Sequence, residues 1–95
     1  MPVVFYSPAA NEDLLAIAEY IARDKPAAAR RWVQRIQETC ELLATQPNLG
    51  ESRSGFGAPT ARMFSVGNYV IFFRAVNGGI EVSRIVHASR DWHNL

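Results

Sequence analysis

The chain has little that could support metal, redox or membrane-spanning roles. Cys40 is the only cysteine among its 95 residues, so no intrachain disulfide can form and a reducing cytoplasm is the expected setting. No apolar run is long enough to cross a bilayer, and the first eight residues lack the basic start and cleavage site of a secretory signal. Neither of the two histidines, His87 and His93, shows metal-ligand spacing. We therefore expect no membrane association, no metal and no cofactor.

Lysine is almost absent too, because Lys25 is the only one and arginine supplies the remaining positive charges. Arginine favours planar, bidentate contacts to carboxylates, phosphates or backbone carbonyls. The net charge is +1, and it divides into −1 for the first fifty residues and +2 for the rest. The five arginines of the second part are Arg53, Arg62, Arg74, Arg84 and Arg90. They form either a solvated sheet face or a surface that binds a partner.

The length and the 48% hydrophobic content predict a single domain over residues 1–95 with one modest core. Residues 3–6 form a short strand-forming run. Ser7 suits the N-cap of a following helix and Pro8 its first turn. Apolar residues then recur at helical spacing as far as Ile21. The sequence therefore predicts a strand followed directly by an amphipathic helix.

A second, longer helix follows a short break in the pattern. Asp24 can cap it, Pro26 suits its opening turn, and Pro47 ends it. Its apolar stripe includes Trp32 and Cys40. We interpret both as core residues, and the cysteine as an inert buried thiol. Two amphipathic helices joined by so short a turn predict an antiparallel helical hairpin.

Three strand-like runs occupy the second half of the chain, at residues 60–66, 69–75 and 80–86. A Gly67-Asn68 turn and an Asn77-Gly78-Gly79 turn separate them, and such turns indicate hairpins. The element order is therefore β-α-α-β-β-β. It predicts an α+β domain with a helical hairpin packed on one face of a small antiparallel sheet.

The residues that could carry chemistry lie on these last strands. No Gly-rich phosphate loop or serine nucleophile motif is present. The strands could bring Arg62, Arg74, Arg84, His87 and Arg90 near one another at one end of the sheet. Such a cluster could cleave RNA without a metal, with histidine as general acid or base and arginine stabilising the phosphate charge. The same groups could instead anchor a protein target.

A third interpretation of these arginines is structural. Arg84 and Arg90 could pair with Glu81 and Asp91 and fix the C-terminal part of the chain. Residue types alone leave the catalytic, binding and structural interpretations open.

Two motifs of the second half of the chain are specific: the hairpin Gly-Asn-Tyr-Val-Ile-Phe-Phe-Arg and the ending Arg-Ile-Val-His-x-x-Arg-Asp. With them belong the segments Ala10–Ile21, the turn Pro47-x-x-Gly50-x-x-Arg53, Arg62, residues 67–74 and residues 79–91. Through these segments nearly the whole chain resembles the ParE branch of the ParE/RelE toxin superfamily. The element order derived above agrees with the RelE/ParE-like fold that the resemblance implies.

The resemblance implies a toxin of a bacterial type II toxin–antitoxin system. Such toxins are neutralised by a cognate antitoxin, here ParD-like, whose C-terminal segment wraps the toxin. Operator DNA is then contacted only indirectly, through the antitoxin. ParE members inhibit DNA gyrase, whereas RelE members cleave mRNA on the ribosome with basic residues and a C-terminal tyrosine or histidine.

This sequence departs from the RNase pattern. The segment Glu51–Pro59 contains no lysine and only one arginine, and the last residues contain no tyrosine. These departures favour a gyrase inhibitor that acts by binding. The alternatives are a RelE-type endoribonuclease, with Arg62, Arg84 and His87 as its catalytic residues, and an inactive relative that acts as co-repressor. The candidate target-binding residues are Arg53, Arg62, Arg74, Arg84, His87 and Arg90.

A surface for the antitoxin also follows from physical reasoning. A disordered segment that folds onto a small domain needs exposed apolar side chains. Phe5, Leu15 and Tyr20 are the candidates, because they exceed what the predicted core requires. Burial of all three is the alternative.

Overall fold

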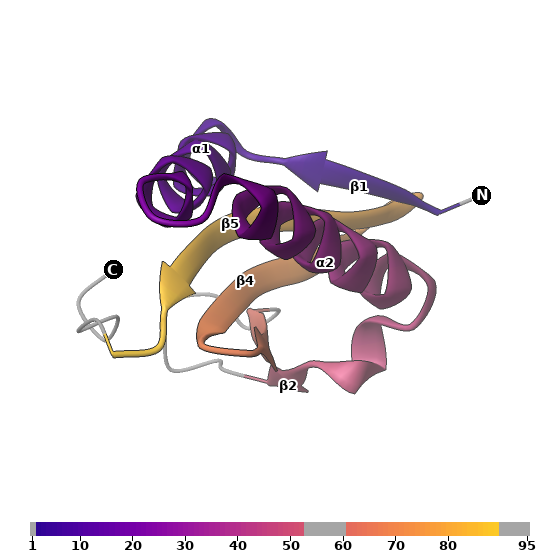
Figure 1. The fold of residues 1–95 in the computed structure, drawn as a ribbon. Coiled ribbons are helices and arrows are strands. Elements are labelled where there is room, and N and C mark those ends of the chain that lie inside the picture. The colour runs from indigo at the N-terminus through magenta and orange to yellow at the C-terminus, as the bar shows by residue number, and fades with distance from the viewer. Residues whose placement is uncertain (1, 53–60, 90–95) are drawn as a thin grey trace.

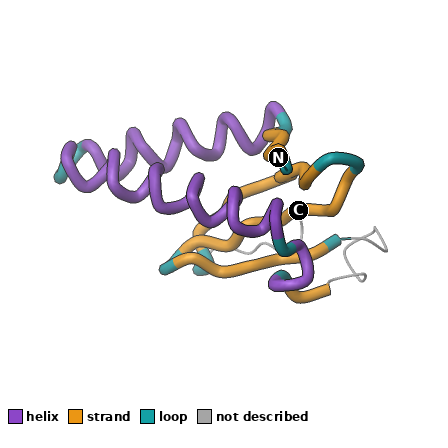
Figure 2. The backbone as a smooth tube through the Cα atoms, turned by 90° about the vertical axis from the view of Figure 1, so that its right-hand side faces the viewer, coloured by secondary structure: helices purple, strands orange, loops and turns teal. Residues whose placement is uncertain are grey.

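Two helices lie on one face of a five-stranded sheet in the computed structural model of this protein, which describes residues 2–52 and 61–89 (Figure 1). Viewed from the side, the helices form one layer and the strands the other (Figure 2). The elements are β1 (Val3–Tyr6), α1 (Pro8–Ala22), α2 (Pro26–Thr45), the 3₁₀ turn η1 (Pro47–Leu49), β2 (Glu51–Ser52), β3 (Arg62–Val66), β4 (Tyr69–Val76) and β5 (Gly79–His87). None of the described helices is both long and apolar enough to cross a membrane.

The predicted order of elements is confirmed, but the sheet is mixed rather than purely antiparallel. Its strand order is β1-β5-β4-β3-β2. Strand β1 runs parallel to β5, and Val3 pairs with Gly79. The other pairings are antiparallel. A parallel pair needs a long connection, and here the helical hairpin and three strands lie between β1 and β5 in the sequence. The short strand β2 was not predicted.

The two helices begin differently. Ser7 caps α1 as predicted, since its Oγ accepts a hydrogen bond from the Ala10 backbone N–H (3.0 Å). The prediction that Asp24 caps α2 is wrong, because Lys25 occupies that position and no side chain caps the helix. The Asp24 N–H instead donates to the Ile21 carbonyl (3.2 Å), so Asp24 continues the end of α1. Pro26 lies in the first turn of α2, as expected.

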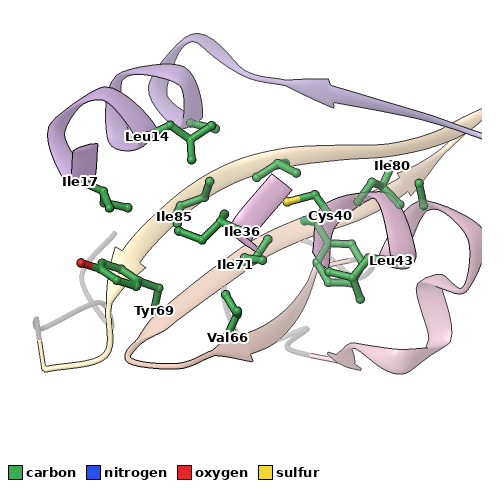
Figure 3. Close-up of a cluster of buried hydrophobic side chains, with 14 residues drawn as sticks. Leu14, Ile17, Ile36, Cys40, Leu43, Val66, Tyr69, Ile71, Ile80 and Ile85 are labelled. Atoms are coloured by element: carbon green, nitrogen blue, oxygen red, sulfur yellow. The ribbon is translucent and has the colours of Figure 1, made fainter. Parts of the chain in front are cut away.

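The core lies between the helical hairpin and the sheet (Figure 3). Residues Ile36, Cys40 and Leu43 of α2 are fully buried against Ile71 and other strand residues. The prediction of a buried thiol is therefore confirmed. A smaller buried cluster, Met63, Val70 and Val86, lies on the opposite face of the sheet. The helices thus cover one face of β4 and β5, and the site lies at the ends of these strands.

Candidate functional site

The described arginines of the predicted cluster are all engaged within the protein. Arg62 donates from Nη1 to the Gly50 carbonyl (2.7 Å). Arg74 forms an exposed ion pair with Glu81 (2.9 Å). Arg84 pairs with Asp13 of α1 rather than with Glu81, so the structural interpretation of Arg84 holds with a different partner (Nε to Oδ2, 2.8 Å). The remaining members, Arg53 and Arg90, lie outside the described residues.

The sheet does not bring Arg62 and His87 together. Arg62 pairs with Phe73 of β4, and His87 pairs with Tyr69. Phe73 and Tyr69 are four residues apart along β4, which corresponds to roughly 13 Å at the rise of a strand. An RNase centre made of Arg62, Arg84 and His87 is therefore not assembled in the described part of the chain.

A groove of about 610 Å³ lies between α1 and the end of β5. We call it the α1–β5 groove. Its polar lining includes Asp13, Glu19, Tyr20, Arg23, Tyr69, His87 and Ser89. The groove forms here because β1 ends at the level of Val82, so that among the described elements α1, and not a strand, flanks the last residues of β5 on the side opposite β4.

Asp13 holds the wall of this groove in place. Its carboxylate accepts two hydrogen bonds from Arg84, from Nε (2.8 Å) and Nη2 (3.1 Å). It also accepts the backbone N–H of Ile85 (2.9 Å), which lies on the strand edge that β1 no longer covers. The hydrogen bond to Asp13 raises the pKa of Arg84 further above its usual value. Asp13 therefore replaces a missing strand partner and orients the end of β5.

His87 lies at the mouth of the groove with one ring nitrogen already occupied. The Ser89 backbone N–H donates to Nδ1 (3.2 Å), and the Ser89 hydroxyl is 2.7 Å from the same atom. A neutral imidazole with Nδ1 as acceptor carries its proton on Nε2. The Tyr69 ring packs edge-on against His87, with centroids 5.4 Å apart. His87 is thus oriented and exposed, and its Nε2 makes no hydrogen bond with another described residue.

The surroundings of His87 suit a protein partner better than a phosphodiester. Among the described residues that line the groove, two carboxylates, those of Asp13 and Glu19, accompany one arginine, Arg23. Burial raises the pKa of Tyr69, and the nearby Tyr20 hydroxyl raises it further, so Tyr69 stays neutral and cannot serve as a phenolate base near pH 7. The groove can offer hydrogen bonds and ring surface, but little positive charge.

The three candidate antitoxin-binding residues are exposed, so the alternative that they are buried is wrong. The exposed fraction is 48% for Phe5, 65% for Leu15 and 72% for Tyr20. Tyr20 lines the α1–β5 groove. Leu15 is five positions away, which at 3.6 residues a turn places it on a different side of α1. The three side chains therefore do not form one compact patch.

Four residues of the groove were not predicted from the sequence as site residues: Asp13, Glu19, Arg23 and Tyr69. Asp13 and Arg84 are 71 positions apart, and no local pattern reports such a pairing. The sequence contained one indication, because Asp13 is an acidic residue next to the apolar stripe of α1, where a side chain need not be exposed. The aromatic residue Tyr69 was assigned to a strand and not to a site.

Comparisons with known proteins agree with this architecture. A solved structure described as a chromosomal ParDE toxin–antitoxin system from P. aeruginosa superimposes with a TM-score of 0.77 at 25% identity, and the match covers 94% of this chain and 98% of that one. The fold thus places the protein among the small toxins of RelE/ParE-like architecture.

The sequence comparisons are more specific. The family model of the ParE toxin of the type II toxin–antitoxin system parDE matches residues 4–92. Toxin RelE2 of Caulobacter vibrioides is 32% identical over 90 residues, which span 95% of this chain and 99% of that toxin. The chain belongs to the ParE toxin family and is a type II toxin of the ParE/RelE superfamily.

Proposed function

We propose that this toxin inhibits growth by binding DNA gyrase, without turning over a substrate, and that a ParD-like antitoxin neutralises it. The observation that carries the binding mode is the state of the candidate catalytic residues. Arg84 is held by Asp13 and Arg62 by the Gly50 carbonyl, and the strand register separates Arg62 from His87. Arg23 is the one arginine among the described residues that line the groove with His87, and two carboxylates share that lining, so strong stabilisation of a developing phosphate charge is not supported.

An induction experiment in cells tests the target. Expression of the chain should produce gyrase-linked DNA breaks, and mRNA 5′ ends should remain as they were before induction. Codon-phased new mRNA ends without DNA breaks would show a RelE-type endoribonuclease instead. Normal growth at full expression would indicate an inactive relative that serves only as co-repressor.

The dispersed apolar residues support an antitoxin that wraps the toxin. Phe5 lies on β1, while Leu15 and Tyr20 lie on different sides of α1. One short helix cannot cover all three, but an extended segment can do so as it folds onto the surface. Tyr20 is the expected anchor, because an exposed tyrosine at a groove provides a large contact area with a polar end.

Co-purification with the protein encoded beside the toxin gene tests this surface. Tyr20→Glu and Leu15→Glu should each weaken capture of the antitoxin at least several-fold, since a charge would be buried in the interface. Asn48→Glu, at an exposed position of η1, adds the same charge and should leave capture unchanged. Equal effects of all three substitutions would argue against the assignment.

A further inference from the structure

Among the described residues, the arginine and lysine side chains without an ion-pair or hydrogen-bond partner lie on the helical hairpin and not on the sheet. Between residues 23 and 37 the sequence contains Arg23, Lys25, Arg30, Arg31 and Arg35, and the only acidic residue there is Asp24. All five cations are exposed. Within the described residues, the side chains of Arg23, Lys25, Arg30 and Arg31 make no ion pair or hydrogen bond. We call Arg30, Arg31 and Arg35, with Lys25 and Arg23 at the preceding turn, the basic half of the hairpin.

The arrangement of these arginines costs the helix some stability. Arg31 and Arg35 are four positions apart on one side of α2, where like charges repel by a few tenths of a kcal/mol. Glu38, three positions after Arg35, is approached by the amide of Gln34 (3.5 Å) and not by a described arginine. Arg35 is oriented by the Trp32 ring, with its guanidinium carbon 5.0 Å from the ring centroid. Packing therefore accounts for Arg35 but not for the other four cations, which a bound polyanion would explain.

The character of this face favours a phosphate backbone over an acidic peptide. A peptide that folds onto a surface uses apolar anchors between its charges, but none of the exposed large hydrophobic residues lies between positions 23 and 37. The helices form one of the two layers of the molecule (Figure 2), and the side chains of the basic half are exposed on it. Arg31 and Arg35 are about 6 Å apart along the helix axis at 1.5 Å a residue, and this spacing on one helix suits the regularly spaced phosphates of a duplex.

We propose that the basic half of the hairpin binds the phosphate backbone of duplex DNA directly, without contacting base edges. Guanidinium groups form bidentate hydrogen bonds with phosphate oxygens. The contact is independent of sequence and depends on salt. It differs from operator recognition through an antitoxin, and it does not depend on the proposal that gyrase is the target.

Fluorescence anisotropy with the full chain and a short mixed-sequence DNA duplex tests the contact. Binding should weaken steeply between about 50 and 200 mM salt, with a log–log slope near −3 for about three phosphate contacts. Arg30→Gln and Arg31→Gln should each weaken binding several-fold at low salt and reduce the slope by about 1. Asn48→Asp makes the same change in net charge at the far end of α2 and should have little effect, because it removes no phosphate contact.

Three results would overturn the proposal. The first is the absence of DNA binding at low salt. The second is equal weakening by Asn48→Asp and Arg31→Gln, which would indicate a net-charge effect alone. The third is binding of poly-glutamate or single-stranded RNA as tightly as duplex DNA with the same dependence on Arg31. Inhibition of gyrase can persist in any of these cases, so failure here is distinguishable from failure of the proposed function.

Discussion

Asp13 accepts three hydrogen bonds from strand β5, two from Arg84 and one from the backbone of Ile85. Its side chain is 14% exposed and that of Arg84 is 32% exposed. Asp13→Ala would leave a partly buried guanidinium and an edge N–H without their partner. We expect it to lower the free energy of unfolding by about 2–3 kcal/mol in urea titrations.

Arg74→Ala provides the comparison for Asp13. The side chains of Arg74 and Glu81 are 52% and 36% exposed, and such surface pairs contribute below about 1 kcal/mol. Equal losses in the two variants would contradict the role given to Asp13 at the edge of β5.

The buried thiol of Cys40 should make the free energy of unfolding depend on pH in the alkaline range. Burial raises the pKa of the Cys40 thiol from 9.0 to about 11. The unfolded chain therefore releases this proton first, and stability that is complete below about pH 9 is lost as the pH rises toward 11. Burial raises the pKa of the neighbouring Tyr6 in the same direction. Urea unfolding measured across this range should show a shallower decline for Cys40→Ala, and an identical decline would contradict the burial of the thiol.

The turns between strands give a prediction at the scale of elements. Gly67 has φ of +58°, and a Cβ there would meet the Trp32 ring, whereas Gly78 has φ of +88° and open space around it. Gly78→Ala should cost about 1 kcal/mol through backbone strain alone. Gly67→Ala should cost at least about 1 kcal/mol more, because the Trp32 ring must move. Equal thermal unfolding temperatures of the two variants would argue against the packing of α2 on the β3–β4 turn.

The elements also show what sequence patterns could and could not predict. Local signals located β1, both helices and the β4–β5 hairpin, because capping, apolar periodicity and turn residues act over a few positions. They could not predict that β1 joins β5 in parallel, since the partners are about 76 residues apart. The α1–β5 groove depends on that pairing, because it begins where β1 ends. Four of its residues, Asp13, Glu19, Arg23 and Tyr69, were therefore missed, whereas Tyr20 and His87 were predicted as candidates.

At the scale of the molecule, the distribution of charge changed meaning once the fold was known. The surplus of arginine in the second half of the sequence directed attention to the sheet. In the structure Arg62, Arg74 and Arg84 bind carbonyl or carboxylate groups of the protein itself. Among the described residues, the cations without an ion-pair or hydrogen-bond partner are on the hairpin. Glu38 and Glu41, further along α2, offset their charge in the net charge of the first fifty residues. The net charges of the two halves of the sequence therefore did not reveal the basic half of the hairpin, which is available to a polyanion.

The toxin as a whole is assigned a binding role, and stoichiometry separates binding from turnover. A fixed amount of gyrase titrated with the purified chain measures both the target and the mode of action. We expect ATP-dependent supercoiling to be lost as the toxin concentration reaches that of gyrase, and we expect added antitoxin to restore it. Supercoiling that remains intact at a large molar excess of folded toxin would contradict the central claim.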